Sequence, residues 1–396
     1  MRAFRGLQRV LFVTLLLAAC SAALPTLAAE AGTSAIEKLD PNFAAKDASG
    51  EWLWYDAKGL TVEGKGWTDT DRFYDRLPAR AKGVVPDSVW TLSHHSAGLC
   101  VRFITDAPKI SARWTVLNKD LAMPHMPATG VSGLDLYVAR AIPARDDNGV
   151  WRWIGNGRPT GQSTEALLAG GIPDGSHEYM VYLPLYNGTE SLEIGVAPTA
   201  TLAKAPARPA GNDKPILFYG TSITHGGCAS RPGMAYPSIL GRRLDRPIVN
   251  LGFSGNGKME AELGALIAEV DAAVYVLDCL PNMTPEMVTE RVEPFVTALR
   301  AARPGTPIVL MENIAYQAGA FLPASKAAYA DKNAALRAAY ERLTAKGLQG
   351  LHYVPGETLL GSDGEATVDG THPTDLGFQR MADALEPVLR KALETP

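Results

Sequence analysis

The hydrophobic pattern of the chain changes near its middle. From about residue 33 to residue 198, apolar and polar residues mostly alternate, as in segments 109–116 and 191–196. A period of two residues is typical of strands with one buried face, and turns rich in Gly, Pro and Asp separate these segments. The pattern predicts an antiparallel β-sandwich over residues 33–198.

From residue 215 onward, short apolar runs alternate with segments of helical period, such as residues 326–343. The runs predict buried strands at 216–219, 248–250, 274–278, 308–311 and 351–354. Strands that alternate with helices indicate a parallel sheet with helices on both faces. We therefore expect an α/β domain over residues 215–396. The Pro- and Ala-rich stretch 199–214 predicts a linker between the two domains.

The amino terminus predicts export. Three arginines fall within the first nine residues, and a largely apolar run follows at 10–24. This run is shorter than the roughly 20 residues of a membrane-spanning helix. Small residues near 26–28 then predict a cleaved signal peptide over residues 1–28. In a second interpretation, the residues before Cys20 resemble a bacterial lipobox, which would make Cys20 a lipid anchor. The first interpretation predicts a periplasmic or secreted protein, and the second an outer-membrane lipoprotein.

Composition excludes some classes of function. The chain has 396 residues, a formal net charge of −4 and mean hydropathy of −0.03. This length suggests two domains. Nothing indicates the basic surface that nucleic-acid binding requires, so no nucleic-acid partner is expected. Disulfides persist in exported proteins, so Cys228 and Cys279 are expected either to form a disulfide or to be two buried thiols. Cys100 lies in a strand pattern and is expected in the core.

Two short segments carry the candidate chemistry. Ser222 directly follows the predicted strand 216–219 in a turn that begins with Gly220. That is the edge at which open α/β sheets bind ligands. Near the other end, Asp369 precedes His372 by three residues. A serine becomes a strong nucleophile when a base takes its proton and a third group orients that base. Ser222, His372 and Asp369 supply these three parts, although each alone would more often be a turn or cap residue.

Several motifs together resemble the SGNH, or GDSL-type, hydrolase superfamily. They are Gly220-Thr221-Ser222, Asn250-Leu251-Gly252-Phe253-Ser254-Gly255, Leu280-Pro281-Asn282 and Asp369-Gly370-Thr371-His372. In the first half, Gly133-Leu134-Asp135-Leu136-Tyr137 looks like the Gly-x-Asp-Leu-Tyr motif of the sandwich domain that precedes some bacterial members.

The resemblance implies a flavodoxin-like α/β/α hydrolase domain that cleaves esters without a cofactor. It also implies an oxyanion hole formed by the N–H groups of Ser222 and Gly255 and the side-chain amide of Asn282. Such donors stabilise the charge of the tetrahedral intermediate. Thr221, Pro281 and Met283 depart from the family pattern, and these departures concern the subgroup and the substrate.

Two residues near Ser222 remain as candidates for substrate binding. His225 is a rival base, but no carboxylate lies nearby in sequence to orient it, so we expect it to line the pocket. Arg231 is expected either to contact substrate or to be solvated. His94 and His95 have no evident third ligand, so no metal site is expected.

These features predict an exported serine esterase that removes acetyl groups from carbohydrate. The substrate class follows from the resemblance and from export. A lipid or aryl esterase or a thioesterase of the same fold is the alternative within the class. A carbohydrate-binding protein with an inactive hydrolase domain is the alternative outside it. The sandwich is expected to pack against the α/β domain and to form one wall of the substrate cleft.

Overall fold

A computed structural model of the chain describes residues 44–139 and 151–394. The described residues belong to one compact unit. The signal peptide expected over 1–28 and the lipid anchor expected at Cys20 lie outside the described residues. Within the described ranges, no helix is both long enough and apolar enough to cross a membrane.

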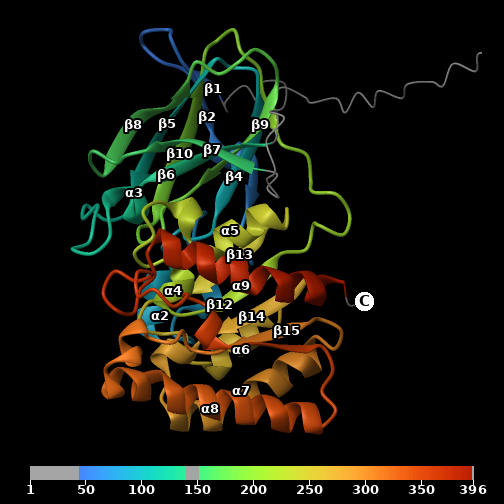
Figure 1. The fold of residues 1–396 in the computed structure, drawn as a ribbon. Helices are drawn as coiled ribbons and strands as arrows, with labels where there is room; N and C mark the ends of the chain where they lie inside the picture. The colour runs from blue at the N-terminus through green and yellow to red at the C-terminus, as the bar shows by residue number, and fades with distance from the viewer. Residues whose placement is uncertain (1–43, 140–150, 395–396) are drawn as a thin grey trace, which may run out of the picture. The chain divides into compact units, whose positions relative to one another are not determined.

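The first half of the chain forms two antiparallel sheets, as the alternating pattern predicted (Figure 1). One sheet has the order β1-β2-β10-β5-β8, and the other β11-β4-β9-β6-β7, with β3 paired to β4. Their bounds are β1 Ala44–Lys46, β2 Leu53–Asp56, β3 Thr61–Glu63, β4 Cys100–Thr105, β5 Lys109–Val116, β6 Leu134–Ala139, β7 Trp151–Gly157, β8 Ser163–Gly170, β9 His177–Tyr182, β10 Thr189–Val196 and β11 Leu202–Lys204. The inner faces of the sheets share a core that includes Trp114, Phe103 and Ile194.

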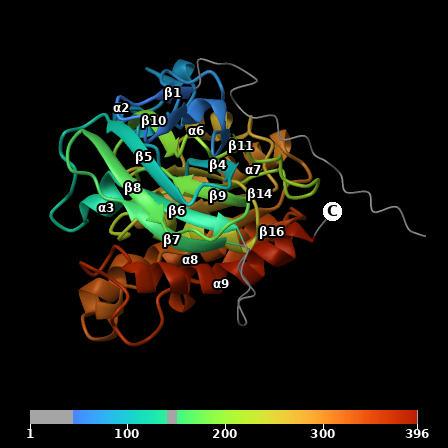
Figure 2. The same ribbon diagram turned by 90° about the horizontal axis from the view of Figure 1, so that it is seen from above.

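The second half forms a five-stranded parallel sheet of order β13-β12-β14-β15-β16. In chain order this is 2-1-3-4-5, the flavodoxin-like arrangement. The strands are β12 Ile216–Gly220, β13 Ile248–Gly252, β14 Val274–Asp278, β15 Ile308–Met311 and β16 Leu351–Val354. The accompanying helices are α4 Ser222–His225, α5 Tyr236–Arg243, α6 Ala261–Ile267, α7 Pro285–Ala302, α8 Pro323–Ala345 and α9 Asp375–Leu393. Figure 2 shows the helix α9 beside the edge strand β16. The α/β class and its strand positions are therefore confirmed.

Each face of the parallel sheet buries its own apolar layer. Along β12, Ile216 and Phe218 point into one layer with α5 and α9, whereas Leu217 and Tyr219 point into the other with α6, α7 and α8. Successive strand side chains point to opposite faces, so a strand covered on both faces must be apolar throughout. This requirement explains the continuous apolar runs of the sequence.

A segment between β3 and β4 packs on the parallel sheet rather than inside the sandwich. Trp67, Leu77 and Val85, together with Val89 of α2 (Asp87–Ser93), belong to the same apolar layer as α6 and α7. In addition, the buried guanidinium of Arg76 donates to the carbonyls of Asn250 and Gly252 at the end of β13, at 3.0 and 2.7 Å. This segment, which the sequence placed within the sandwich domain, thus packs on the neighbouring parallel sheet.

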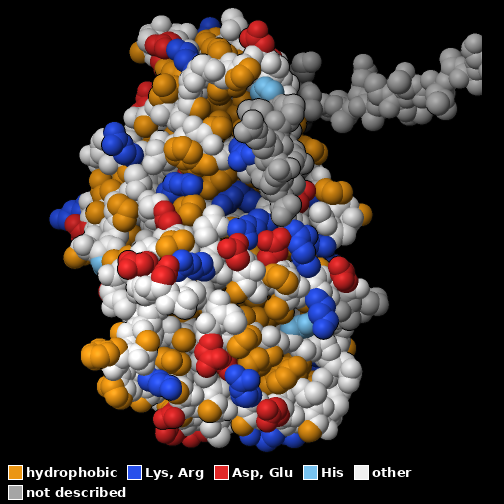
Figure 3. All heavy atoms as spheres, in the orientation of Figure 1, with side chains coloured by type: hydrophobic (Ala, Val, Ile, Leu, Met, Phe, Trp, Pro, Cys, Tyr) orange, Lys and Arg blue, Asp and Glu red, His pale blue; other side chains and the backbone are white. Residues whose placement is uncertain are grey.

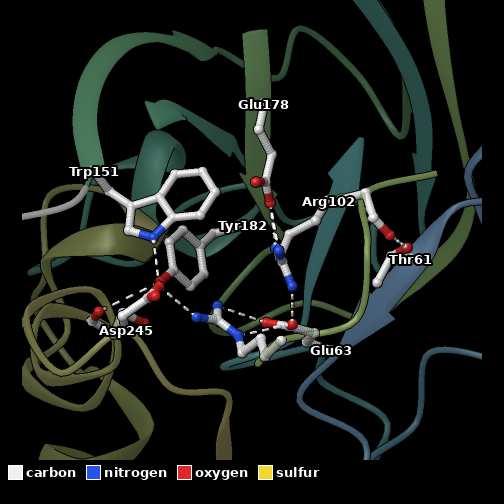
Figure 4. A network of polar contacts seen from close by, with 10 residues as sticks. Thr61, Glu63, Arg102, Trp151, Glu178, Tyr182 and Asp245 are labelled. Atoms are coloured by element: carbon white, nitrogen blue, oxygen red, sulfur yellow. Dashed lines mark hydrogen bonds and ion pairs between the residues drawn. The ribbon is translucent and has the colours of Figure 1, made fainter. Parts of the chain in front are cut away.

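The linker expected over residues 199–214 begins later than its composition indicated, because β11 pairs with β4 and extends the second sheet to Lys204. Within the remainder, Arg208 donates to Glu63 of the sandwich at 2.9 Å and to Asp245 of the α/β domain at 2.6 Å. Figure 4 shows the network around these residues, in which Arg102 joins Glu63 to Glu178. Buried charges are costly unless they are paired in this way. The linker is thus fixed to both domains rather than a free tether.

Charged side chains of both signs lie next to one another on the face shown in Figure 3. Among the described residues, Arg243 forms an ion pair with Asp383, and Arg380 forms one with Asp363. Exposed pairs of this kind contribute at most about 1 kcal/mol each to stability.

Candidate active site

Three loops meet at the carboxyl edge of the parallel sheet. The first begins with α4, whose cap residue Thr221 accepts from the N–H of Ile223 through its side chain at 3.3 Å. The second follows β13, and Phe253 N–H donates to the Gly220 carbonyl at 3.0 Å. The third follows β14, and its Asn282 donates through Nδ2 to the Asn256 carbonyl of the second loop at 2.7 Å.

The structure brings Ser222, His372 and Asp369 into one hydrogen-bonded chain. Ser222 Oγ lies 2.9 Å from His372 Nε2, and His372 Nδ1 lies 2.7 Å from Asp369 Oδ2. Ser222 is the first residue of α4, and the other two belong to the loop before α9. These residues lie far apart in the chain, but the fold of the sheet places the end of β12 and the start of α9 at the same edge.

Asp369 shapes its own loop as well as holding the imidazole. Its other carboxylate oxygen accepts from the backbone N–H groups of Thr371 and His372, at 3.0 and 2.7 Å. Partial burial opposes ionisation of Asp369, but the hydrogen bonds from His372 and Thr371 outweigh it and lower the pKa of Asp369 to about 2. An ionised carboxylate can only accept, so Nδ1 of His372 carries the proton and Nε2 keeps a lone pair directed at Ser222.

The two other residues expected in an oxyanion hole lie in the second and third loops. Gly255 has φ of +71°, a backbone conformation that favours glycine. Asn282 uses one N–H on Asn256, which holds the amide in place and leaves its second N–H available. Lys332 of α8 donates to the carbonyl of Pro281 at 3.2 Å, which also helps to hold the third loop, the one that carries Asn282. Burial lowers the pKa of Lys332 to about 8.

Two residues of the sandwich reach the site, and no local signal in the sequence identified them. Tyr186, in the loop between β9 and β10, donates through its hydroxyl to the Ser222 carbonyl at 3.2 Å. The ring of His125 has its centroid 5.9 Å from that of His372. Both loops are anchored, because Met126 and Leu185 share an apolar core with Ala229 of the α/β domain.

A buried carboxyl group lies behind the candidate nucleophile. Asp278, the last residue of β14, accepts from the hydroxyls of Thr224 and Tyr236, at 2.8 and 2.9 Å. Complete burial raises the pKa of Asp278 to about 7, although the two hydrogen bonds act in the opposite direction. The contact fixes α4, which carries Ser222, against the end of the neighbouring strand.

The expectation that His225 lines the pocket was wrong. Its side chain is fully buried, its Nε2 lies 2.7 Å from the Leu185 carbonyl, and its ring stacks on Tyr186 at 4.1 Å. Burial, reinforced by Arg76 and His95, holds the pKa of His225 well below its usual value. His225 is therefore a neutral packing residue between the two domains.

The structure places Arg231 against the sandwich. It donates to Asp135 Oδ2 at 2.6 Å and to the hydroxyl of Tyr137 at 2.5 Å, and it lies 5.0 Å from the centroid of the Trp153 ring. Asp135 also accepts from the N–H of Gly233 at 2.9 Å. The Gly133–Tyr137 motif thus holds the loop that follows α4.

The described cysteines are buried thiols rather than partners in a disulfide. Cys100, Cys228 and Cys279, all within the described residues, are free and buried. Cys279 packs in the apolar layer beside Leu280, and its Sγ lies 3.6 Å from the Tyr219 carbonyl. Cys228 instead lies beside His372. The two thiols therefore point into different surroundings, and no disulfide joins these two described residues.

Comparisons with known proteins agree with this architecture. The model of the GDSL-like lipase/acylhydrolase family matches residues 213–390, and the model of the amino terminus of SGNH-hydrolase-type esterases matches residues 52–202. A comparison with curated proteins finds no match.

Among solved structures, a protein described as a GDSL-like lipase from Bacteroides ovatus is 36% identical, with a TM-score of 0.79, and the match covers 87% of this chain and 99% of that one. The salicylyl-acyltransferase SsfX3 from a tetracycline biosynthetic pathway is 20% identical, with a TM-score of 0.63 and coverage of 89% and 94%. An acetyl xylan esterase from Butyrivibrio proteoclasticus is 13% identical, with a TM-score of 0.53 and coverage of 87% and 99%. The last two share the fold. The extent and identity of the first match, with both family models in order, show that this chain belongs to the GDSL-like lipase/acylhydrolase family of ester-hydrolysing enzymes.

Proposed function

We propose that the protein is an exported serine esterase that removes acetyl groups from carbohydrate. The observation that carries the proposal is the continuous chain of hydrogen bonds from Ser222 Oγ through His372 to Asp369. The acetyl-carbohydrate class is supported by neighbours of the same fold, among them the acetyl xylan esterase and a family two carbohydrate esterase from Clostridium thermocellum in complex with cellohexaose. Export is supported by the basic and apolar pattern of residues 1–28.

In this proposal, Ser222 Oγ attacks the acetyl carbonyl carbon while its proton passes to Nε2 of His372. The carbonyl oxygen becomes an oxyanion, and the N–H groups of Ser222 and Gly255 and the second amide N–H of Asn282 donate to it. His372 then gives the proton to the sugar oxygen as its bond to the acetyl carbon breaks, and the sugar leaves with a free hydroxyl. A water molecule repeats the sequence on the acetyl-serine and releases acetate. Asp369 keeps Nδ1 protonated and stabilises the imidazolium.

The test compares the wild-type chain with Ser222→Ala and His372→Ala on a chromogenic acetyl ester and on acetylated oligosaccharides. Both variants are expected to lose at least about a thousandfold in kcat, because residues of such a triad act as a unit. His225→Ala is the matched control, and it should retain at least about a hundredfold more activity than His372→Ala. The reverse ranking would make His225 the base.

The same assays distinguish the substrate classes. Preference for acetylated oligosaccharides over long-chain lipid esters, aryl esters and thioesters is the expected result. Faster turnover of one of the other classes would overturn the carbohydrate assignment and keep the serine mechanism. Binding of oligosaccharides without hydrolysis of any ester would indicate an inactive hydrolase domain.

A further inference from the structure

Three side chains of the kinds that bind transition metals meet beside the candidate active site. His125, Cys228 and His372 each offer one ligand atom, and these atoms all lie within 4.8 Å of one another. His125 comes from the sandwich, Cys228 from the loop after α4, and His372 from the loop before α9. One thiolate and two imidazoles are a donor set typical of Zn²⁺, which takes four ligands in a tetrahedral arrangement.

The backbone holds two of these residues in place independently of His372. His125 lies in a tight turn in which Met123 and Met126 exchange backbone hydrogen bonds of 3.0 and 3.1 Å, and Met126 is buried in the core shared by the two domains. Cys228 has φ of +72°, a conformation that residues other than glycine rarely adopt. Two residues earlier, Gly226 caps the end of α4 with φ of +103°. This turn places the thiol beside His372.

We propose that His125, Cys228 and Nε2 of His372 bind a Zn²⁺ ion, with water as the fourth ligand, and that the bound ion blocks ester hydrolysis. Nε2 is the available nitrogen of His372, because Nδ1 carries the proton that it donates to Asp369. Binding forms one Zn–S and two Zn–N bonds and releases the thiol proton to solvent, with no change of oxidation state. Binding itself does not depend on the proposed function, whereas the inhibition rests on it.

The inhibition follows from competition for one lone pair. The lone pair that would accept the Ser222 proton is the one that would bind the metal. A Zn²⁺ ion on Nε2 also repels any further positive charge on the imidazole. Ester hydrolysis therefore stops when the metal binds, without movement of either domain.

The experiment uses the full chain, stripped of metal and then titrated with Zn²⁺. Binding is followed by calorimetry and inhibition by turnover of a chromogenic acetyl ester. We expect one ion per chain and inhibition that parallels binding. His125→Ala and Cys228→Ser should each raise the inhibitory Zn²⁺ concentration at least about tenfold, measured against the metal-free rate of the same variant. His177→Ala, which removes a histidine from β9 of the sandwich, is the matched control. Zn²⁺ should inhibit this variant at the same concentration as the wild type.

Cobalt provides a readout that does not depend on activity. Co²⁺ bound to a thiolate gives a ligand-to-metal charge-transfer absorption, which Cys228→Ser should abolish and Cys100→Ala should retain. If Zn²⁺ inhibits the His125 and Cys228 variants as strongly as the wild type, the ion acts on His372 and Asp369 alone and the proposal is wrong. A cobalt absorption that persists in Cys228→Ser would also overturn it. If the chain hydrolyses no ester, calorimetry and the cobalt spectrum still decide whether the site exists.

Discussion

A single carboxylate in the loop before α9 orients the imidazole and also forms the loop that carries it. Asp369 binds the ring of His372 through one oxygen and two backbone N–H groups through the other. Since the same hydrogen bonds lower its pKa to about 2, Asp369 remains ionised throughout the range in which a histidine base works. Its stabilising contribution is present above its unfolded pKa and is lost only as the pH falls toward 2.

Asn282 provides a test of the proposed oxyanion hole at the same scale. Asn282→Ala should lower kcat by about 10²–10³-fold and leave KM nearly unchanged, because the donor acts on charge that develops only in the transition state. The measurement is steady-state kinetics on an acetyl ester. Asn256→Ala is the matched control, since it shortens a side chain in the neighbouring loop but keeps the carbonyl that Asn282 binds. A change confined to KM would make Asn282 a substrate-binding residue.

At the scale of elements, the nucleophile depends on contacts that fix a very short helix. α4 has only four residues, so its own hydrogen bonds contribute little to its stability. It is held by Asp278 through Thr224 on one side and by Tyr186 through the Ser222 carbonyl on the other. One contact comes from the parallel sheet and the other from the sandwich, so both domains set the position of Ser222.

The buried carboxyl group of Asp278 should make stability depend on pH. Its pKa is raised from 3.8 to about 7, so between these pH values the folded state keeps a proton that the unfolded chain has already released. Its contribution is therefore fully present below pH 3.8 and is lost as the pH rises toward 7. Each pKa unit corresponds to about 1.4 kcal/mol, so the whole effect amounts to a few kcal/mol.

Asp278→Asn removes this titration and keeps an oxygen that accepts from Thr224 and Tyr236. Urea denaturation of both proteins between pH 4 and pH 8 measures the difference in unfolding free energy. The variant should gain stability relative to the wild type as the pH rises. A difference that stays constant over this range would show that Asp278 is ionised throughout.

At the scale of the whole molecule, the two domains share their interior. Trp67, Leu77 and Val85 lie before most of the sandwich strands in sequence but cover a face of the parallel sheet. Met126 and Leu185 enter the layer on its other face. The sandwich therefore supplies cover to both sides of the α/β domain and supplies Tyr186 to the candidate active site.

Residues 213–396 expressed alone should be insoluble or unstable, because truncation exposes both of these surfaces. Removing even one such side chain, as in Leu77→Ala of the full chain, should cost about 2–5 kcal/mol of unfolding free energy. Solubility, thermal unfolding and activity on acetylated oligosaccharides are the measurements, with the full chain as reference. A soluble fragment with full activity would show that the sandwich is dispensable.

The parts of this architecture that local sequence determines could be predicted. The five parallel strands appear as continuous apolar runs, and Ser222 and His372 lie in short motifs beside them. Residues 64–97 contact the parallel sheet through partners more than 100 residues away, such as Asn250 for Arg76, and no local period marks these contacts. Tyr186 contacts Ser222 and His225, which belong to the other domain. His225 was misplaced for this reason, because the residues that bury it, Leu185 and Tyr186, belong to the other domain.

The placement of residues 64–97 also bears on the order in which the chain folds. The ribosome releases this segment before any strand of the parallel sheet has been made. Until β12 to β15 exist, side chains such as Trp67 and Leu77 have nothing to cover, although the sandwich strands around them are complete by Lys204. Exposed apolar segments of this kind promote aggregation while synthesis continues. A segment that is synthesised early is thus among the last to reach its final position.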